Sequence, residues 1–408
     1  MTVHQHLALA ALFGLTLAGC TGSSSPTCSF VDPARLANST WPKFRANLQN
    51  TGTVTNVTVS TNPGQIEHMF PPAGDDPKGP FIASPVINSD GSLIYIGSVD
   101  GTLYALRTAD LTQNTSFNLT IAESITSTAV AALRDGQDAI FMGGGDTRLY
   151  ALNATGGVQP GFWPYLLSGF ISASPTLNVT DGTIYIAGQN GLLAGVCPNG
   201  ITRFALSTDS IQSSPASGAD GILYFGSDDR VLRAVQGDGP VKWAITASAP
   251  ILAAPVLEVA ANGTPVAIYA ADRGGRVFKV DTSGRPVAGF NFQAVAPISS
   301  SPALAGGRLY FGSDDGNLYA VNKDDGTVAW TVATGGPIIS SPAVAVGQAS
   351  DVVVVVGSTD GRLYFVDDAN PTTPHSLDLH ASIESSPAIS ADGTVYVGTD
   401  EGRVYAIK

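Results

Sequence analysis

Apolar residues in this chain form short uninterrupted runs that are separated by polar turns. Residues 312–321 read GSDDGNLYAV, and nearly the same phrase returns as GSVDGTLYAL at 97–106, GSTDGRLYFV at 357–366 and GTDEGRVYAI at 398–407. Asp-Gly between two apolar runs favours a tight hairpin, because Gly adopts positive φ without steric cost. The runs are apolar on consecutive residues instead of alternating, which predicts strands that are covered on both faces.

A second phrase precedes each hairpin and sets the period. Its eight copies are IASPVI at 82, ITSTAVA at 125, ISASPTL at 171, IQSSPAS at 211, ILAAPVL at 251, ISSSPAL at 298, IISSPAV at 338 and IESSPAI at 383. The Pro position, which is Ala129 in the second copy, recurs every 40 to 47 residues. Eight units at this period, each with signals for four short strands, indicate a propeller or a solenoid.

The two ends of the repeat array distinguish a closed ring from an open one. The last unit stops at GRVYAIK, its third strand, whereas Ile66–Phe70 aligns with an outer strand and has no unit of its own. If this N-terminal strand completes the last blade, the ring has no open edge of the kind that a solenoid exposes. We therefore predict an all-β fold, an eight-bladed β-propeller of four-stranded antiparallel blades whose ring is closed by an N-terminal strand.

Composition agrees with this fold and limits the partners. The 408 residues are 44% hydrophobic and only 13% charged, and they include 46 Gly and 26 Pro. This balance is typical of many short buried strands joined by tight turns. The formal net charge of −13 opposes binding to phosphate backbones. We therefore expect no nucleic-acid partner.

The N-terminus resembles the export signal of bacterial lipoproteins. LALAALFGLTL at 7–17 is too short to span a bilayer, suits the apolar part of a signal peptide and leads into LAGC at 17–20. The resemblance implies a signal peptide over 1–19 and a lipid on the thiol of Cys20, although MTVHQH at 1–6 lacks Lys and Arg. A flexible Ser-rich tether would follow over 20–40. The alternative is an ordinary signal peptide with a chance cysteine.

A lipid on Cys20 would place the protein at the outer membrane, because the family's sorting habit depends on the next residue and Thr21 is not Asp. The sequence leaves open whether the protein faces the periplasm or the cell surface. Cys28 and Cys197 would then be the remaining cysteines, and in an oxidising compartment they are candidates for a disulfide. Whether the two residues meet is not decided by their spacing.

The repeats resemble the PQQ-like propeller repeat, which runs from a Ser-Ser-Pro strand through Gly-Ser-x-Asp-Gly-x-Leu-Tyr-Ala-Leu to a strand ending in Trp. The resemblance covers 41–408 and implies one propeller over that range. Quinone-dependent dehydrogenases of this family usually carry an adjacent Cys-Cys pair and a calcium ion, whereas this chain has three Cys and no adjacent pair. Its size, signal and blade count are more similar to the lipoprotein scaffold of the outer-membrane barrel-assembly machinery.

Five carboxylates are candidates for a functional face because they occupy equivalent turns. These are Asp100, Asp146, Asp229, Asp315 and Asp360. As a ring on one face they would form a cation site or a dock for a basic partner. The structural alternative is the turn itself, since Asp beside Gly accepts hydrogen bonds from nearby backbone donors. We favour that alternative, because ligands of one metal must converge and these carboxylates occur once per blade.

An aromatic cluster, GFWPYLLSGF at 161–170, is a second candidate for partner binding, since Trp163 and Tyr165 are residue types that often anchor interfaces. Its alignment with GFNFQ at 289–293 also makes it an outer strand of the second blade. An outer strand still buries one face. The cluster therefore has both an interaction and a structural interpretation.

The sequence predicts a non-enzymatic, lipid-anchored propeller that binds other envelope proteins as a scaffold. No nucleophile elbow, phosphate loop or zinc motif occurs in it, so we assign no catalytic residue, metal ligand or cofactor. One alternative is a PQQ- or metal-dependent oxidoreductase. Another is a propeller that senses or binds carbohydrates or other small ligands.

Overall fold

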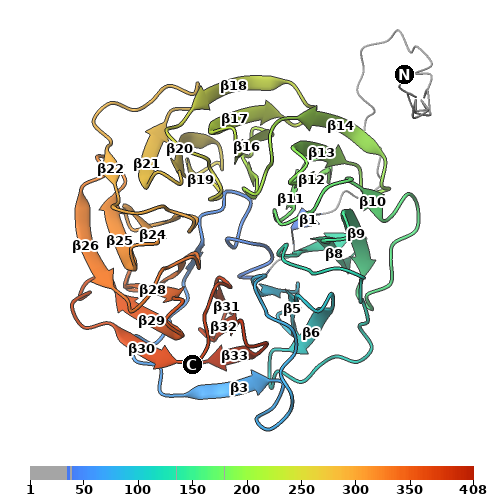
Figure 1. Cartoon of the computed structure of the whole chain (residues 1–408), viewed down its shortest axis with the longest axis horizontal. Coiled ribbons are helices and arrows are strands. Elements are labelled where there is room, and N and C mark those ends of the chain that lie inside the picture. The colour runs from blue at the N-terminus through green and yellow to red at the C-terminus, as the bar shows by residue number, and fades with distance from the viewer. Residues whose placement is uncertain (1–34, 37–38, 135, 179) are drawn as a thin grey trace, which may run out of the picture.

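The computed structural model describes residues 35–36, 39–134, 136–178 and 180–408. These residues form eight sheets that follow one another around a ring, as Figure 1 shows, and all their strands pair antiparallel except Thr53–Thr55, which pairs parallel with Ala343–Val346. We number the sheets blade 1 to blade 8 in chain order. The predicted fold class, an eight-bladed β-propeller, is confirmed.

The strands occupy four positions in a blade, from the axis to the rim. The inner strands are β4 (Val86–Ile87), β7 (Val130–Arg134), β11 (Thr176–Leu177), β15 (Ala216–Ser217), β19 (Val256–Val259), β23 (Ala303–Ala305), β27 (Ala343–Val346) and β31 (Ala388–Ile389). The second strands are β5 (Leu93–Gly97), β8 (Gln137–Gly143), β12 (Ile184–Ala187), β16 (Ile222–Gly226), β20 (Pro265–Ala271), β24 (Arg308–Gly312), β28 (Val352–Gly357) and β32 (Val395–Gly398).

The third strands carry the second half of each hairpin phrase. They are β6 (Leu103–Arg107), β9 (Arg148–Asn153), β13 (Leu192–Val196), β17 (Val231–Gln236), β21 (Arg276–Val280), β25 (Asn317–Asn322), β29 (Arg362–Asp367) and β33 (Val404–Ile407). The outer strands are β10 (Tyr165–Leu166), β14 (Thr202–Ser207), β18 (Val241–Thr246), β22 (Phe292–Gln293), β26 (Val328–Ala333), β30 (His375–Asp378) and β3 (Ile66–Phe70). Two short strands, β1 (Arg35–Leu36) and β2 (Thr53–Thr55), lie inside the inner strands of blades 2 and 7.

The uninterrupted apolar runs become strands that are buried on both faces. Every residue of β16 and β28 is buried, because neighbouring blades cover the two sides of each sheet. The Gly of the Asp-Gly turn has positive φ as expected, for example 80° at Gly316. Outer strands such as β18 instead alternate between exposed and partly buried residues.

The ring is closed as the sequence predicts. β3 pairs antiparallel with β33, so that Ile66 is opposite Ile407 and Phe70 is opposite Val404. Figure 1 shows this blue strand at the rim beside the red C-terminal blade. The backbone pairing of the two ends of the chain leaves blade 8 with four strands.

Blade 1 departs from the regular pattern at its rim. Its sheet contains three strands, β4, β5 and β6, and the segment after β6 pairs only through isolated bridges at Thr102–Thr120 and Leu106–Gln113. The segment holds its place through backbone bonds, including Leu103 N–H to the Leu119 carbonyl at 3.0 Å. Our expectation of a regular fourth strand in this unit was wrong, because a turn at Leu111, with φ of 55°, and Asn114 bends the segment.

The Ser-Ser-Pro phrases form a hydrogen-bonded ring around the axis. The backbone N–H of the residue before Pro in one blade donates to the hydroxyl of the equivalent residue in the next blade, at 2.9 to 3.2 Å. The seven bonds join Ser84 to Thr128, Thr128 to Ser174, Ser174 to Ser214, Ala254 to Ser301, Ser301 to Ser341, Ser341 to Ser386, and Ser386 to Ser84. The one interruption is at Ala254, which has no hydroxyl for Ser214. The repeated phrase therefore joins neighbouring blades at the inner edge of the ring.

The segment from Ser39 to Thr55 fills the centre of the ring, where Figure 1 shows it in blue. Its carbonyl oxygens accept bonds from inner strands of six blades, beginning with Ile87 N–H to Trp41 at 2.8 Å and ending with Val344 N–H to Gly52 at 2.8 Å. Thr40 adds a bond from its hydroxyl to the carbonyl of Ile389 in blade 8. We call residues 39–55 the axial plug. These contacts include Ser39 and Thr40, which fall within the predicted tether.

The described residues contain no helix that is long and apolar enough to cross a bilayer. The predicted signal peptide, 1–19, and Cys20 and Cys28 lie outside the described residues. Most of the tether, 20–40, lies outside them as well. These assignments stay predictions.

Candidate functional site

The five candidate aspartates all lie on one face of the ring, in the turns between second and third strands. We call this the Asp-turn face; the inner Ser-Ser-Pro segments begin at the same end of each blade. Asp315 is typical: its carboxylate accepts the Asn317 N–H at 2.9 Å and the Tyr319 hydroxyl at 2.8 Å. The carboxylate thus joins the turn to the strand that follows it.

The other four aspartates repeat this arrangement with small changes. Asp100, Asp146 and Asp360 each accept a backbone N–H two residues later and a Tyr hydroxyl four residues later. In blade 4 the tyrosine is replaced by Arg233, whose guanidinium forms an ion pair with Asp229. Each carboxylate is therefore occupied within its own blade, which agrees with the structural interpretation of these turns.

The pKa shifts show which protonation states the turns maintain. Burial, together with the hydrogen bond to the carboxylate, raises the pKa of Tyr319 and of Tyr364 to about 12, so both remain neutral donors. Partial burial alone would raise the pKa of Asp229, but hydrogen bonds from Arg233 and Ser227 outweigh it and lower that pKa. Among the described residues, no three His, Cys, Asp or Glu side chains come together as ligands for a metal ion.

A second set of acidic groups surrounds the opening of the axis on the Asp-turn face. This axial mouth is a cavity of about 170 Å³ with Phe44 of the plug and the eight inner segments as its lining, including Glu384 and Gln212. Asp228 reaches it through a bond from Gln212, at 3.4 Å. Asp400, whose N–H bonds the Ser382 carbonyl, lies beside Glu384.

Three aspartates in turns between second and third strands are only partly hydrogen-bonded. One oxygen each of Asp228, Asp314 and Asp400 is hidden from solvent and accepts no hydrogen bond, although the other Asp314 oxygen lies 4.0 Å from Arg273. Burial raises the pKa of Glu384, and the negative charge of Asp400 raises it further. Burial also raises the pKa of Asp314 and Asp400.

Two buried cations lie in the plug itself. The Lys43 ammonium donates to the carbonyls of Phe44 and Asn47, at 2.8 and 3.2 Å, and to the side chain of Asn50 at 2.5 Å. Burial and the nearby charge of Arg45 lower the pKa of Lys43 to about 7, and burial lowers that of Arg45 to about 9. Arg45 bonds the carbonyl of Pro342, while its Nε and one terminal nitrogen have no partner. These groups tie the plug to the ring.

The opposite face holds a wider cavity between blades 8 and 1, of about 650 Å³. Glu67, Asp90 and Asp392 line it, and Lys408 pairs with Asp392 at 2.7 Å. Hydrogen bonds within its own turn, from Ser92, lower the pKa of Asp90. Both cavities therefore present carboxylates.

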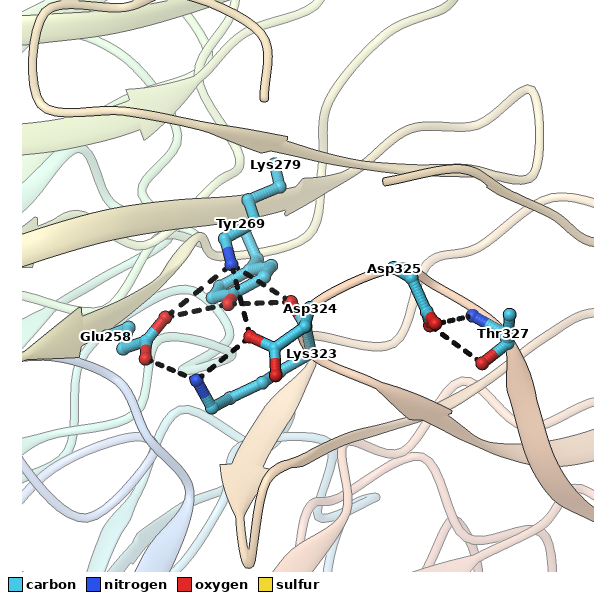
Figure 2. A network of polar contacts seen from close by, with 7 residues as sticks. All are labelled: Glu258, Tyr269, Lys279, Lys323, Asp324, Asp325 and Thr327. Carbon is cyan, nitrogen blue, oxygen red and sulfur yellow. Dashed lines mark hydrogen bonds and ion pairs between the residues drawn. The ribbon is translucent and has the colours of Figure 1, made fainter. Parts of the chain in front are cut away.

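The densest charged network lies between blades 5 and 6 and is shown in Figure 2. Glu258 accepts bonds from Lys323 at 2.6 Å and from the Tyr269 hydroxyl at 2.8 Å, and the Lys279 ammonium lies 5.1 Å from the centre of the Tyr269 ring. Although burial alone would raise the pKa of Glu258, its bond from Lys323 lowers it, and the pKa of Lys323 is raised by the same bond. Both groups stay ionised near neutral pH, so the network joins blades and is not poised for proton transfer.

Pyrroloquinoline quinone does not fit either cavity. This cofactor carries carboxylates of its own, and Glu384 lines the axial mouth while Glu67, Asp90 and Asp392 line the wider cavity. Carboxylates repel an anionic ligand, although Asp392 is paired with Lys408. The buried cations Lys43 and Arg45 line neither cavity and already bond to carbonyl oxygens.

The two aromatic candidates are placed differently by the structure. The expected outer strand of blade 2 exists as β10, but Trp163 is buried, packs against Phe141 and donates its ring N–H to the Pro198 carbonyl at 2.9 Å. Its proposed place in an exposed interaction face is therefore corrected: Phe162 and Leu166 are the exposed apolar side chains. Tyr165 is partly exposed, and its hydroxyl accepts a bond from Thr202.

Cys197 is buried in the turn after β13 and is disulfide-bonded. Its bonding partner lies outside the described residues, as do Cys20 and Cys28. The predicted pairing of Cys197 with Cys28 therefore stays a prediction.

Comparison with known proteins supports the repeat assignment. The family model described as outer membrane protein assembly factor BamB matches residues 262–408, from blade 5 to the C-terminus. The chain is 34% identical to BamB of Salmonella typhimurium over 89 residues, which are 20% of this chain and 23% of that protein. It is 29% identical to the serine/threonine-protein kinase AfsK of Streptomyces griseus over 183 residues, 43% of this chain and 22% of the kinase. The aligned regions thus span less than a quarter of these relatives.

Solved structures match far more of the ring. BamB from Moraxella catarrhalis superposes with a TM-score of 0.64 at 16% identity, over 84% of this chain and 97% of that one. Quinohemoprotein alcohol dehydrogenase from Comamonas testosteroni gives a TM-score of 0.68 at 15% identity, over 90% and 80% of the two chains. At these identities the likeness concerns the fold alone. Repeats, family match and ring together identify a PQQ-like β-propeller repeat protein that resembles BamB.

Proposed function

We propose that this protein is a non-enzymatic, lipid-anchored scaffold that binds other envelope proteins at the outer membrane. The observation that carries the proposal is the axial mouth, a carboxylate-lined opening at the centre of a closed ring. A rigid ring with a fixed acidic centre is suited to holding a partner, and we assign no catalytic residue to it. The similarity to an outer membrane protein assembly factor supports the same class of function.

The chemistry of the axial mouth selects a basic partner segment. A Lys or Arg side chain entering the mouth would lie beside Glu384 and would lower the cost of ionising that carboxyl group. The cavity of about 170 Å³ has room for one such side chain and not for a folded element. The surrounding Asp turns would then contact the rest of the segment, which gives Asp100, Asp146, Asp229, Asp315 and Asp360 a peripheral role.

The test is capture of envelope proteins by the full mature protein, followed by substitution of the mouth. Asp228→Asn, Glu384→Gln and Asp400→Asn together should reduce recovery of the captured protein at least about tenfold, since charge pairs at a desolvated centre dominate such contacts. The matched control carries Asp238→Asn and Asp324→Asn, in third-to-fourth strand turns on the opposite face. Equal loss with the control, or no loss with the mouth variant, contradicts the proposal.

The anchor is tested separately through Cys20. Labelled palmitate should enter the wild-type protein in its native host and should not enter Cys20→Ser. Equal labelling of both forms would contradict the lipid anchor, without bearing on the axial mouth.

The second candidate function is quinone-dependent oxidation, which the similarity to alcohol dehydrogenases of known structure keeps in view. We expect purified protein mixed with the quinone and Ca²⁺ to show no stoichiometric quinone spectrum and no reduction of dye by alcohols. Calcium-dependent dye reduction by this protein would replace the scaffold proposal with the enzyme.

A further inference from the structure

Charged side chains are sparse in the chain segment that contains the outer edge of blade 2 and most of blade 3. The 54 residues from Leu149 to Thr202 contain one charged side chain, Asp181, whereas 13% of the whole chain is charged. Asp181 itself forms an ion pair with Arg203. At the other border, Arg148 pairs with Asp146 at 3.3 Å. In a protein with a net charge of −13, this is an unusually neutral stretch of surface.

The same stretch exposes large apolar side chains. Phe162 is 69% exposed, Leu166 57%, and Val158 and Ile201 42% each. They come from two adjoining segments, the outer edge of blade 2 and the turn before β14 in blade 3. The Phe162 N–H bonds the Asn199 carbonyl at 3.0 Å, and Thr202 bonds the Tyr165 hydroxyl at 3.1 Å. We call Val158, Phe162, Leu166 and Ile201 the neutral rim; β10 and β14 mark it at the right of Figure 1.

Elsewhere the exposed apolar residues occur singly. Val241 lies on β18, Val328 on β26, Val266 on β20 and Val295 after β22. Isolated exposed apolar side chains are normal on protein surfaces, whereas a contiguous set rimmed by polar residues indicates an interaction site. The neutral rim is therefore distinguished from the rest of the ring by the clustering of its apolar side chains, with Arg148 opposite Leu166 at its border.

Two observations relate the start of the described chain to blades 2 and 3. β1 pairs with β7, the inner strand of blade 2, so the described chain enters the ring at that blade. Cys197, in the blade 3 turn that contains Asn199, is disulfide-bonded. From Cys20 to Arg35 the chain can extend at most about 50 Å. A lipid on Cys20 would therefore hold the ring close to the membrane and could bring blades 2 and 3 against it.

We propose that the neutral rim rests on the lipid surface, with Phe162 and Leu166 inserted at the boundary between headgroups and acyl chains. This inference rests on the lipid anchor of the proposed function. Aromatic and aliphatic side chains favour that boundary, and an uncharged rim avoids the repulsion that an acidic surface meets at anionic lipid. The contact would orient the ring with its disc steeply inclined to the membrane, so that both the axial mouth and the opposite face remain open.

Fluorescence quenching of the lipidated full-length protein in phosphatidylcholine vesicles tests the contact. With Phe162→Trp, the added emission should shift to shorter wavelength and be quenched by lipid brominated on the acyl chain. Val295→Trp is the matched control, since Val295 is 95% exposed on a distant blade, and its emission should not be quenched. Equal quenching of the two variants, or none, overturns the proposal.

Vesicle binding without the lipid separates the rim from the anchor. The mature chain with Cys20→Ser should sediment weakly with phosphatidylcholine vesicles, and Phe162→Asp with Leu166→Asp should lower this binding at least about tenfold. Val266→Asp with Val295→Asp should leave it unchanged. If the rim variant instead loses a captured envelope protein and keeps its vesicle binding, the rim is a protein dock and the lipid proposal is wrong. If palmitate labelling fails while vesicle binding depends on Phe162, the anchor is wrong and the rim contact stands.

Discussion

The centre and the rim of the ring obey different constraints. At the centre every inner strand must meet two neighbours and the axial plug, and the same hydrogen bond recurs between successive blades. At the rim each blade ends in an open edge, and the outer element ranges from a six-residue strand, β26, to the irregular segment of blade 1. The comparison teaches that segments making the same contacts in every blade keep the same structure. Segments that face solvent differ between blades and can acquire a function.

The largest effect should come from removing the axial plug together with the closing strand. A chain that begins at Gly79 lacks the plug and the closing strand β3, so blade 8 would expose the edge of β33. We expect it to lose cooperative melting in calorimetry and to aggregate in light scattering. A chain that begins at Asn38 keeps both elements and should melt like the mature protein. If the two chains melt alike, the centre does not hold the ring together.

Ile66→Pro weakens the same closure less, because Pro is tolerated at the start of an edge strand. Its melting temperature should fall between those of the two chains. A fall as large as that of the chain beginning at Gly79 would contradict this ranking.

The ring of hydrogen bonds between Ser-Ser-Pro phrases should respond to the loss of a single hydroxyl group. Ser386→Ala removes the acceptor of the Ser341 N–H, which is buried, and should lower the free energy of unfolding by about 1–3 kcal/mol in urea titration. The interruption of this ring at Ala254 allows the opposite change. Ala254→Ser supplies a hydroxyl that can accept the Ser214 N–H, and it should raise the free energy of unfolding by a smaller amount. If neither substitution changes stability, the ring of bonds is only a consequence of the repeat.

The Asp turns lie between centre and rim and should show an intermediate effect. Asp360 accepts bonds from the N–H groups of Arg362 and Gly335 and from the Tyr364 hydroxyl. Asp360→Ala should therefore cost about 1–2 kcal/mol of stability in urea titration. Asp238→Ala, in an exposed turn on the other face, should cost nothing measurable. A variant that keeps full stability but loses partner binding would make Asp360 a binding residue instead.

The smallest effect concerns the axial mouth and depends on pH. Because the pKa of Glu384 is higher in the folded protein, the folded state binds more protons. Its stabilising contribution is present below the ordinary value of 4.5 and is lost as the pH rises through the folded pKa. Glu384→Gln should thus raise the melting temperature at pH 7, by about 1 °C, and leave it unchanged near pH 4. An equal gain at both pH values would show that the charge is not involved.

Several features follow from local sequence. Each hairpin is specified by an Asp-Gly turn between apolar runs, and the unpaired strand at Ile66–Phe70 predicts the closure that β3 makes with β33. Trp163 shows the limit of such reasoning. Phe162 and Trp163 precede the short outer strand β10, so the alternation of a strand does not apply to them and the sequence does not show which of the two is exposed. The packing of Trp163 against Phe141 and Pro198 decides it.

By itself the sequence determined the number of blades, their hairpins and the closed ring, because these depend on short patterns repeated along the chain. The tertiary structure decided what those patterns do together. It made the Ser-Ser-Pro phrases a ring of bonds between residues 40 or more positions apart, threaded Lys43 and Arg45 through the axis, and brought Phe44, Gln212 and Glu384 to one mouth. Such groupings arise only when blades distant in the chain meet around one axis, and no single repeat contains the information that places them.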